Sequence, residues 1–166
     1  MTVSNLITAE FIDTIRAHYR LHWDGIHGYA HWQRVRENGL RLAELNGANP
    51  NIIEYFAFTH DSQRHSDGFD LQHGSRATQF IRVHLKPLIQ LNPVELDLLI
   101  QACDHHTGGQ SHADITVMTC WDADRLDLMR VGIRPNPKYL CTEAARTAEI
   151  LNWAIERSIQ GRINRF

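Results

Sequence analysis

The residues of this chain that could do chemistry are histidines and aspartates placed at the ends of apolar stripes. Eleven of the 166 residues are histidine, and histidine is the commonest metal ligand among side chains. His60 and Asp61 end a strongly apolar stretch, and Ile53, Phe56 and His60 recur at helical spacing, so the imidazole should face the core. A buried imidazole and carboxylate need partners. A divalent metal ion satisfies both, and a hydrogen-bonded core histidine is the simpler alternative.

Similar residues lie on the core-facing stripes of three further predicted helices. These are His31, His106 and Asp124. Taken singly, His31 could be a capping or aromatic-stacked histidine, and Asp124 could pair with Arg34 or Arg146. Polar groups buried from several directions are costly unless they are paired. A shared ion therefore explains these residues together better than separate partners do.

The elements that must position these residues are predicted to be helices. Apolar residues recur at helical spacing along several segments, with capping residues before them and glycine or proline after most of them. The predicted helices span residues 8–19, 29–46, 50–61, 73–85, 92–107, 114–131 and 142–159. No segment reads as a strand, so we expect an all-α, single-domain bundle of about seven helices over residues 1–166. The site would occupy about residues 27–130, with the C-terminal helix packed on it.

Composition argues against several classes of function. A formal charge of -2 and a pI near 6.6 leave no basic footprint, so no nucleic-acid partner is expected. The N-terminus lacks a signal pattern and no segment approaches ~18 consecutive apolar residues, so no membrane association is expected. Cys103, Cys120 and Cys141 lack CxxC spacing and should be reduced core residues. These features favour a cytoplasmic protein of unknown oligomeric state.

The order of the motifs resembles a known family. An H-x-x-R-V motif at residues 31–35 is followed by His-Asp at 60–61 and by A-D-R-L at 123–126. This arrangement is similar to that of the HD superfamily of metal-dependent phosphohydrolases, over roughly residues 27–130. The resemblance implies an HD-like helical domain whose ligands bind a divalent metal ion: Mn, Mg, Fe, Co, Ni or Zn. The implied ligands are His31, His60, Asp61 and Asp124.

Further matches extend the resemblance to a substrate and a second ion. Many members place a lysine that approaches the substrate phosphate just after the His-Asp pair, and this chain has Arg64 there. Arginine can bind a phosphate through two parallel hydrogen bonds. Binuclear members carry additional histidines, and His73, His105 and His106 fit those places. The G-Y-P tripeptide of the cyclic-dinucleotide branch is absent.

The function that this resemblance implies is hydrolysis of a small phosphorylated compound, for example a nucleotide, by a metal-activated water. Asp61, Arg64 and His106 would be the catalytic residues, with Arg64 stabilising charge on the phosphate. His105 or His106 would donate a proton to the leaving group or bind a second ion. Two alternatives are an HD-type di-iron oxygenase and a non-catalytic, metal-stabilised regulatory domain.

Helical phase predicts which of the two neighbouring carboxylates, Asp122 or Asp124, faces the core. At about 100° per residue their side chains diverge by roughly 200°. Asp124 continues the stripe of Val117, Cys120 and Trp121. We therefore predict that Asp124 faces the core as a ligand and that Asp122 faces away from it.

Overall fold

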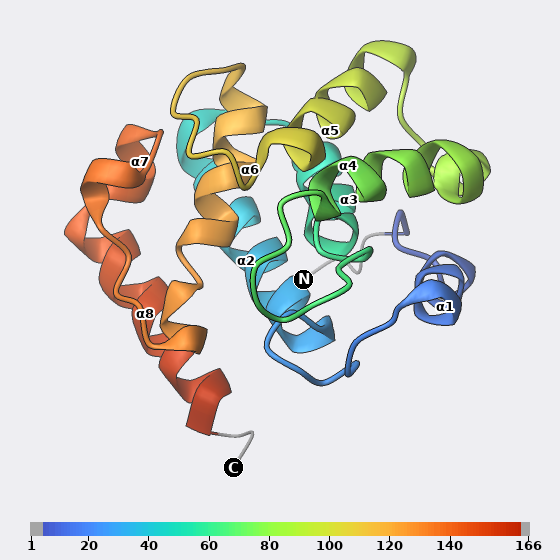
Figure 1. The fold of residues 1–166 in the computed structure, drawn as a ribbon. Coiled ribbons are helices and arrows are strands. Elements are labelled where there is room, and N and C mark those ends of the chain that lie inside the picture. The colour runs from blue at the N-terminus through green and yellow to red at the C-terminus, as the bar shows by residue number, and fades with distance from the viewer. Residues whose placement is uncertain (1–4, 164–166) are drawn as a thin grey trace.

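The computed structural model describes residues 5–163, and within them every regular element is a helix (Figure 1). The α-helices are α1 (Ala9–His18), α2 (Tyr29–Asn46), α3 (Pro50–Thr59), α4 (His73–Phe80), α5 (Pro93–His105), α6 (Ile115–Arg125), α7 (Glu143–Arg146) and α8 (Ala148–Ile163). A π-helix, Ile81–Leu85, and three 3-10 helices, Lys86–Leu88, Leu128–Val131 and Pro137–Tyr139, complete the set. The all-α prediction is confirmed. Residues 1–4 and 164–166 of the expected domain lie outside the described residues.

Capping residues set the beginnings of several helices. The Thr8 hydroxyl accepts a hydrogen bond from the Phe11 amide at the start of α1. Asn92 and Glu95 form a reciprocal capping box at the start of α5, which satisfies two amides that have no partner within the helix. Gly47 ends α2 in the left-handed region, at φ 76°, which glycine adopts without steric cost. These local signals fix where α1 and α5 begin and where α2 ends.

Helix α3 lies at the centre of the bundle. All its residues from Ile52 to Thr59 are buried, because α2, α5 and α6 all pack against it. Each large apolar side chain buried in this way contributes about 1.5–3 kcal/mol. The charged Glu54 on this helix accepts two hydrogen bonds from Arg36 of α2. The end of α3 is therefore held firmly inside the molecule.

The C-terminal segment packs on this core, but as two helices instead of one over 142–159. Thr147 has an extended backbone, with ψ 144°, and separates α7 from α8. The break shifts the helical phase, so Ile150 is buried and Ala148 is exposed. A second apolar cluster joins α7 and α8 to α2 and to the residues that follow α6 (Figure 1). Its members are Leu42, Leu126, Leu140, Ala145, Ile150, Leu151 and Ala154.

Two other predicted helices differ from the structure in their final turns. The segment predicted as 73–85 changes from an α-helix to a π-helix at Ile81, which leaves His84 exposed and buries Leu85. The segment predicted as 114–131 is α-helical only as far as Arg125, and a separate 3-10 helix follows. None of the described helices is both long and apolar enough to cross a membrane.

Candidate metal centre

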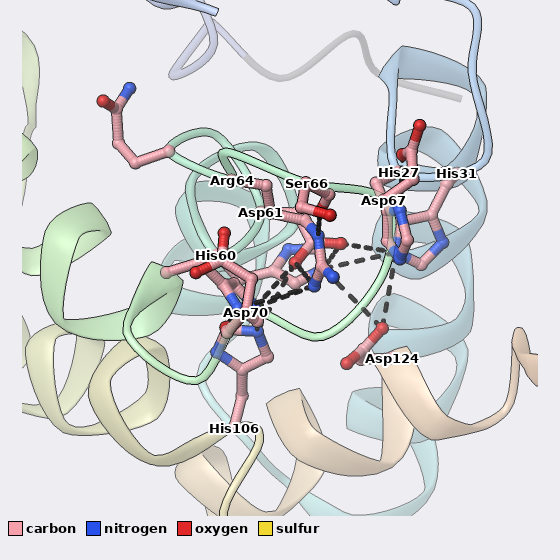
Figure 2. Close-up of polar contacts among 12 residues, drawn as sticks. His27, His31, His60, Asp61, Arg64, Ser66, Asp67, Asp70, His106 and Asp124 are labelled. Carbon is pink, nitrogen blue, oxygen red and sulfur yellow. Dashed lines mark hydrogen bonds and ion pairs between the residues drawn. The ribbon is translucent and has the colours of Figure 1, made fainter. Parts of the chain in front are cut away.

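Five helix ends bring the predicted ligands together. His31 lies in the first turn of α2, His73 is the first residue of α4, and Asp124 lies in the last turn of α6. His60 and Asp61 directly follow α3, and His106 directly follows α5. Figure 2 shows the side chains of His31, His60, Asp61, His106 and Asp124 pointing toward a common centre. The four histidines and Asp61 are buried, while 19% of the Asp124 side chain is exposed.

The first cluster consists of His31, His60 and Asp124, with one oxygen of Asp61. The Nε2 atoms of His31 and His60 lie 3.3 Å apart, and Asp124 Oδ1 lies 3.3 Å from the first and 3.6 Å from the second. Asp61 Oδ2 lies 3.5 Å from His31 Nε2 and 3.6 Å from His60 Nε2. Donor atoms about 2.1 Å from one ion lie about 3.0–3.4 Å apart. The five distances lie within this range or up to 0.2 Å beyond it, so these four atoms are placed to surround a single divalent ion.

The second cluster consists of the other Asp61 oxygen with His73 and His106. Asp61 Oδ1 lies 3.0 Å from His73 Nε2 and 3.5 Å from His106 Nε2. The two Nε2 atoms are 2.8 Å apart. Asp61 therefore offers one oxygen to each cluster and connects them.

The tautomers of all four histidines direct an electron pair into the site. Nδ1 of His60 contacts the Phe56 and Ala57 carbonyls at 3.1 Å, Nδ1 of His106 contacts the Cys103 carbonyl at 2.7 Å, and Nδ1 of His73 contacts the Asp70 carbonyl at 2.5 Å. Nδ1 of His31 faces the Asp127 carboxylate at 2.7 Å. These oxygens can only accept, so each Nδ1 carries a proton, and in the neutral form of each ring Nε2 is the acceptor. Acceptors that face one another need a cation or a proton between them.

Asp127 is a residue of the site that the sequence argument missed. It is 1% exposed, and its second carboxylate oxygen accepts a hydrogen bond from Arg34 Nε at 2.8 Å. A carboxylate on the outer nitrogen of a ligating histidine fixes the orientation of the ring and raises its basicity. Arg34 therefore partners Asp127, and Arg146 binds the Leu140 carbonyl. The arginine alternative for Asp124 is wrong.

The electrostatics of the first cluster favour charged forms. Burial raises the pKa of Asp61 and Asp124, but neighbouring histidines outweigh burial and hold both well below the usual range. Burial and the charge of Arg130 lower the pKa of His31. Its hydrogen bonds to Asp124, Asp127 and Asp61 nevertheless raise that pKa to about 9. The carboxylates thus hold a positive charge at His31 Nε2 at neutral pH.

Arg64, predicted to contact substrate, lies against the second cluster. Its Nη1 is 3.2 Å from His73 Nε2 and 3.5 Å from Asp61 Oδ1. Figure 2 shows the segment that carries Arg64, Ser66, Asp67 and Asp70 crossing one side of the site. Asp67 also accepts a hydrogen bond from buried His27 at 2.9 Å. Neither His27 nor Asp67 was predicted from the sequence as a residue of the site.

Two expected positions need correction. His105, a candidate for the second ion, is exposed, because it points away from the face of α5 that carries His106. Its Nε2 atom lies 3.7 Å from Asp104 Oδ2. Asp122 was expected to face away from the core, yet it is fully buried. It accepts hydrogen bonds from the amides of Cys141 and Thr142 and from the Thr142 hydroxyl. Burial raises the pKa of Asp122 despite these donors.

Comparisons with known proteins give no match for this chain, whether with family models, curated proteins or solved structures. The resemblance to the HD superfamily therefore stays a prediction based on the motifs. The site described above rests on the distances and tautomers of the chain's own residues.

Proposed function

We propose that this chain is a metal-dependent phosphohydrolase, similar to the HD superfamily, that acts on a small phosphorylated compound. The observation that supports this most strongly is the convergence of four histidine Nε2 atoms and carboxylate oxygens of Asp61 and Asp124 in one site. Imidazole and carboxylate donors in one buried site suit divalent transition metals and Mn or Mg. We also propose that the protein is cytoplasmic, as the sequence leads us to expect.

The chemistry is divided between the bound group and the chain. A divalent ion bound by His31, His60, Asp61 and Asp124 would supply Lewis acidity toward a phosphoryl oxygen and a bound water of lowered pKa. Arg64 would donate charge-assisted hydrogen bonds to the phosphate. His106, whose Nδ1 proton is committed to the Cys103 carbonyl, would exchange a proton with the leaving group only through Nε2. Asp61 would connect the two clusters, because it offers one carboxylate oxygen to each.

A di-iron oxygenase is the second candidate, and the second cluster is the observation that favours it. Asp61, His73 and His106 could ligate a further ion beside the first. A metal-stabilised regulatory domain is the third candidate, and it would require the same first cluster but no turnover.

The test begins with metal analysis of protein purified without added metal, followed by a phosphatase screen with each candidate ion. We expect metal-dependent release of phosphate from at least one small phosphorylated compound. Asp124→Ala should abolish this activity, while His105→Ala, an exposed control, should retain it. Oxygen consumption by coloured, iron-loaded protein, or tight metal binding with no hydrolysis across the screen, would contradict the proposal in favour of the second or third candidate.

A further inference from the structure

Arg64 occupies the second cluster with a buried guanidinium. Only 8% of the residue is exposed. Its Nη1 lies 3.2 Å from Nε2 and 3.4 Å from Nδ1 of His73, and 3.5 Å from Asp61 Oδ1. These two residues supply two of the three donors of the cluster. A permanent positive charge is therefore already in contact with the atoms that would ligate a second ion.

The chain fixes the guanidinium in this position. Arg64 Nε donates to the Ser66 carbonyl at 3.1 Å, and Nη2 donates to the Gly68 carbonyl at 2.8 Å. The segment that provides these carbonyls is itself tied down, because Asp70 accepts hydrogen bonds from Arg76 and from the His65 amide. With Nε and Nη2 committed to the backbone, Nη1 is held beside the His73 ring, nearly equidistant from its two nitrogens.

His73 can accept from only one partner at Nε2. Its Nδ1 proton is committed to the Asp70 carbonyl at 2.5 Å, so Nε2 has a single electron pair. His106 Nε2 at 2.8 Å, Asp61 Oδ1 at 3.0 Å and Arg64 Nη1 at 3.2 Å surround that nitrogen. The positive charge of Arg64 therefore lies where it would repel a second ion. We propose that the Arg64 guanidinium takes the place of a second metal ion, so that the centre is mononuclear, with one ion in the first cluster and Arg64 beside it. This inference rests on the proposed metal centre.

The arrangement bears on substrate class. A guanidinium offers directed hydrogen bonds and a fixed charge that suit a phosphate group, but it has no redox chemistry. Arg64 beside one ion therefore favours a phosphate ester bound across both charges. A di-iron oxygenase would have to displace Arg64 from His73 before a second iron could bind.

The test is the number of manganese ions bound per chain, measured by equilibrium dialysis and elemental analysis. Electron paramagnetic resonance serves as a second readout, because two adjacent manganese ions give an exchange-coupled signal. Wild type is compared with Arg64→Ala and with Arg64→Met, which retains more of the side chain's volume. Arg76→Ala is the matched control, because Arg76 supports the same segment through Asp70 and the Gln63 carbonyl but contacts no donor of the cluster. Circular dichroism establishes that each variant is folded.

We expect one ion in wild type and in Arg76→Ala, and two ions with a coupled signal in the Arg64 variants. Adding His73→Ala to Arg64→Ala should restore a single ion. Two ions in wild type, or one ion in folded Arg64 variants, would overturn the inference and leave the proposed phosphohydrolase standing. No bound manganese in wild type and no stabilisation by any other candidate ion would overturn the metal centre, and the proposed function with it.

Discussion

The orientation of His31, a proposed ligand, is set by Asp127, a residue outside the proposed ligand set. His31 Nδ1 donates to Asp127 at 2.7 Å, and Asp127 is held in turn by Arg34. Figure 2 shows the imidazole of His31 directed toward Asp61 and Asp124. The orientation of the ring therefore depends on a carboxylate that lies outside the proposed ligand set.

Substitution of Asp127 tests this dependence. Asp127→Asn keeps an oxygen that can accept from His31 but removes the charge that supports its basicity, so metal affinity should fall by about 10–100-fold. Saturating metal should still load the first cluster. Isothermal titration calorimetry measures the affinity, with exposed Asp104→Asn as control. Unchanged affinity in Asp127→Asn would show that the carboxylate has no part in the site.

Asp124 and Asp122 provide a matched pair on one helix. Asp124→Ala should abolish binding to the first cluster, because it removes an oxygen that lies 3.3 Å from His31 Nε2. Asp122→Asn should lower stability by about 1–3 kcal/mol, because it disturbs the buried acceptor for Cys141 and Thr142, but the metal should remain. Metal content and chemical denaturation of both variants give the answer. Metal retained in folded Asp124→Ala would refute its assignment as a ligand.

Sequence patterns selected four residues that converge in the structure, but not the residues that support them. His31, His60 and His106 each extend an apolar stripe and are buried, whereas Asp124 is partly exposed beside them. The burial of Asp122 could not be deduced in this way. Its side of α6 is covered by residues 141–142, and a helical wheel carries no information about a segment that returns from far along the chain. The sequence signal for Asp127 is its spacing, because it follows Asp124 by three residues, close to one helical turn.

At the scale of elements, the site depends on where helices stop. Gly74, next to His73, allows α4 to begin against the end of α5. A Cβ atom at this position would lie 2.5 Å from the Cys103 carbonyl oxygen and 3.1 Å from that of Asp104. These are backbone atoms that cannot easily move. The close approach brings His73 to within 2.8 Å of His106.

Gly74→Ala should therefore force the two helices apart. We expect a loss of about 1–3 kcal/mol in the free energy of unfolding, measured by urea denaturation. Gly108→Ala is the control, because a Cβ atom there would meet nothing closer than 3.6 Å. Equal stabilities of the two variants would contradict the packing described here.

The helix ends were also the least predictable part of the fold. Capping signals placed the starts at Thr8, Asn92 and Thr142 correctly. The π-helix at Ile81 and the break at Thr147 were missed, because apolar spacing continues through both positions and tertiary packing selects the phase. The change to a π-helix leaves His84 exposed.

For the whole molecule, metal binding should be linked to pH through His31. In metal-free protein its pKa is raised to about 9, so His31 is protonated at neutral pH and must lose that proton to bind an ion. His31 should therefore release about one proton per ion at pH 7, and this release should disappear above pH 9. Apparent affinity should rise by up to about tenfold per pH unit below pH 9. Calorimetry in buffers of different ionisation enthalpy measures the released proton, and an affinity that falls between pH 7 and 9 would contradict the assignment.

The central claim is that one ion joins the ends of α2, α3 and α6. The most direct test is a crystal of the manganese-loaded protein, measured on both sides of the manganese absorption edge. We predict an anomalous peak bounded by His31, His60, Asp61 and Asp124, with Arg64 still in contact with His73. A manganese-loaded crystal with its anomalous peak at surface histidines such as His84, and none within the first cluster, would contradict the account.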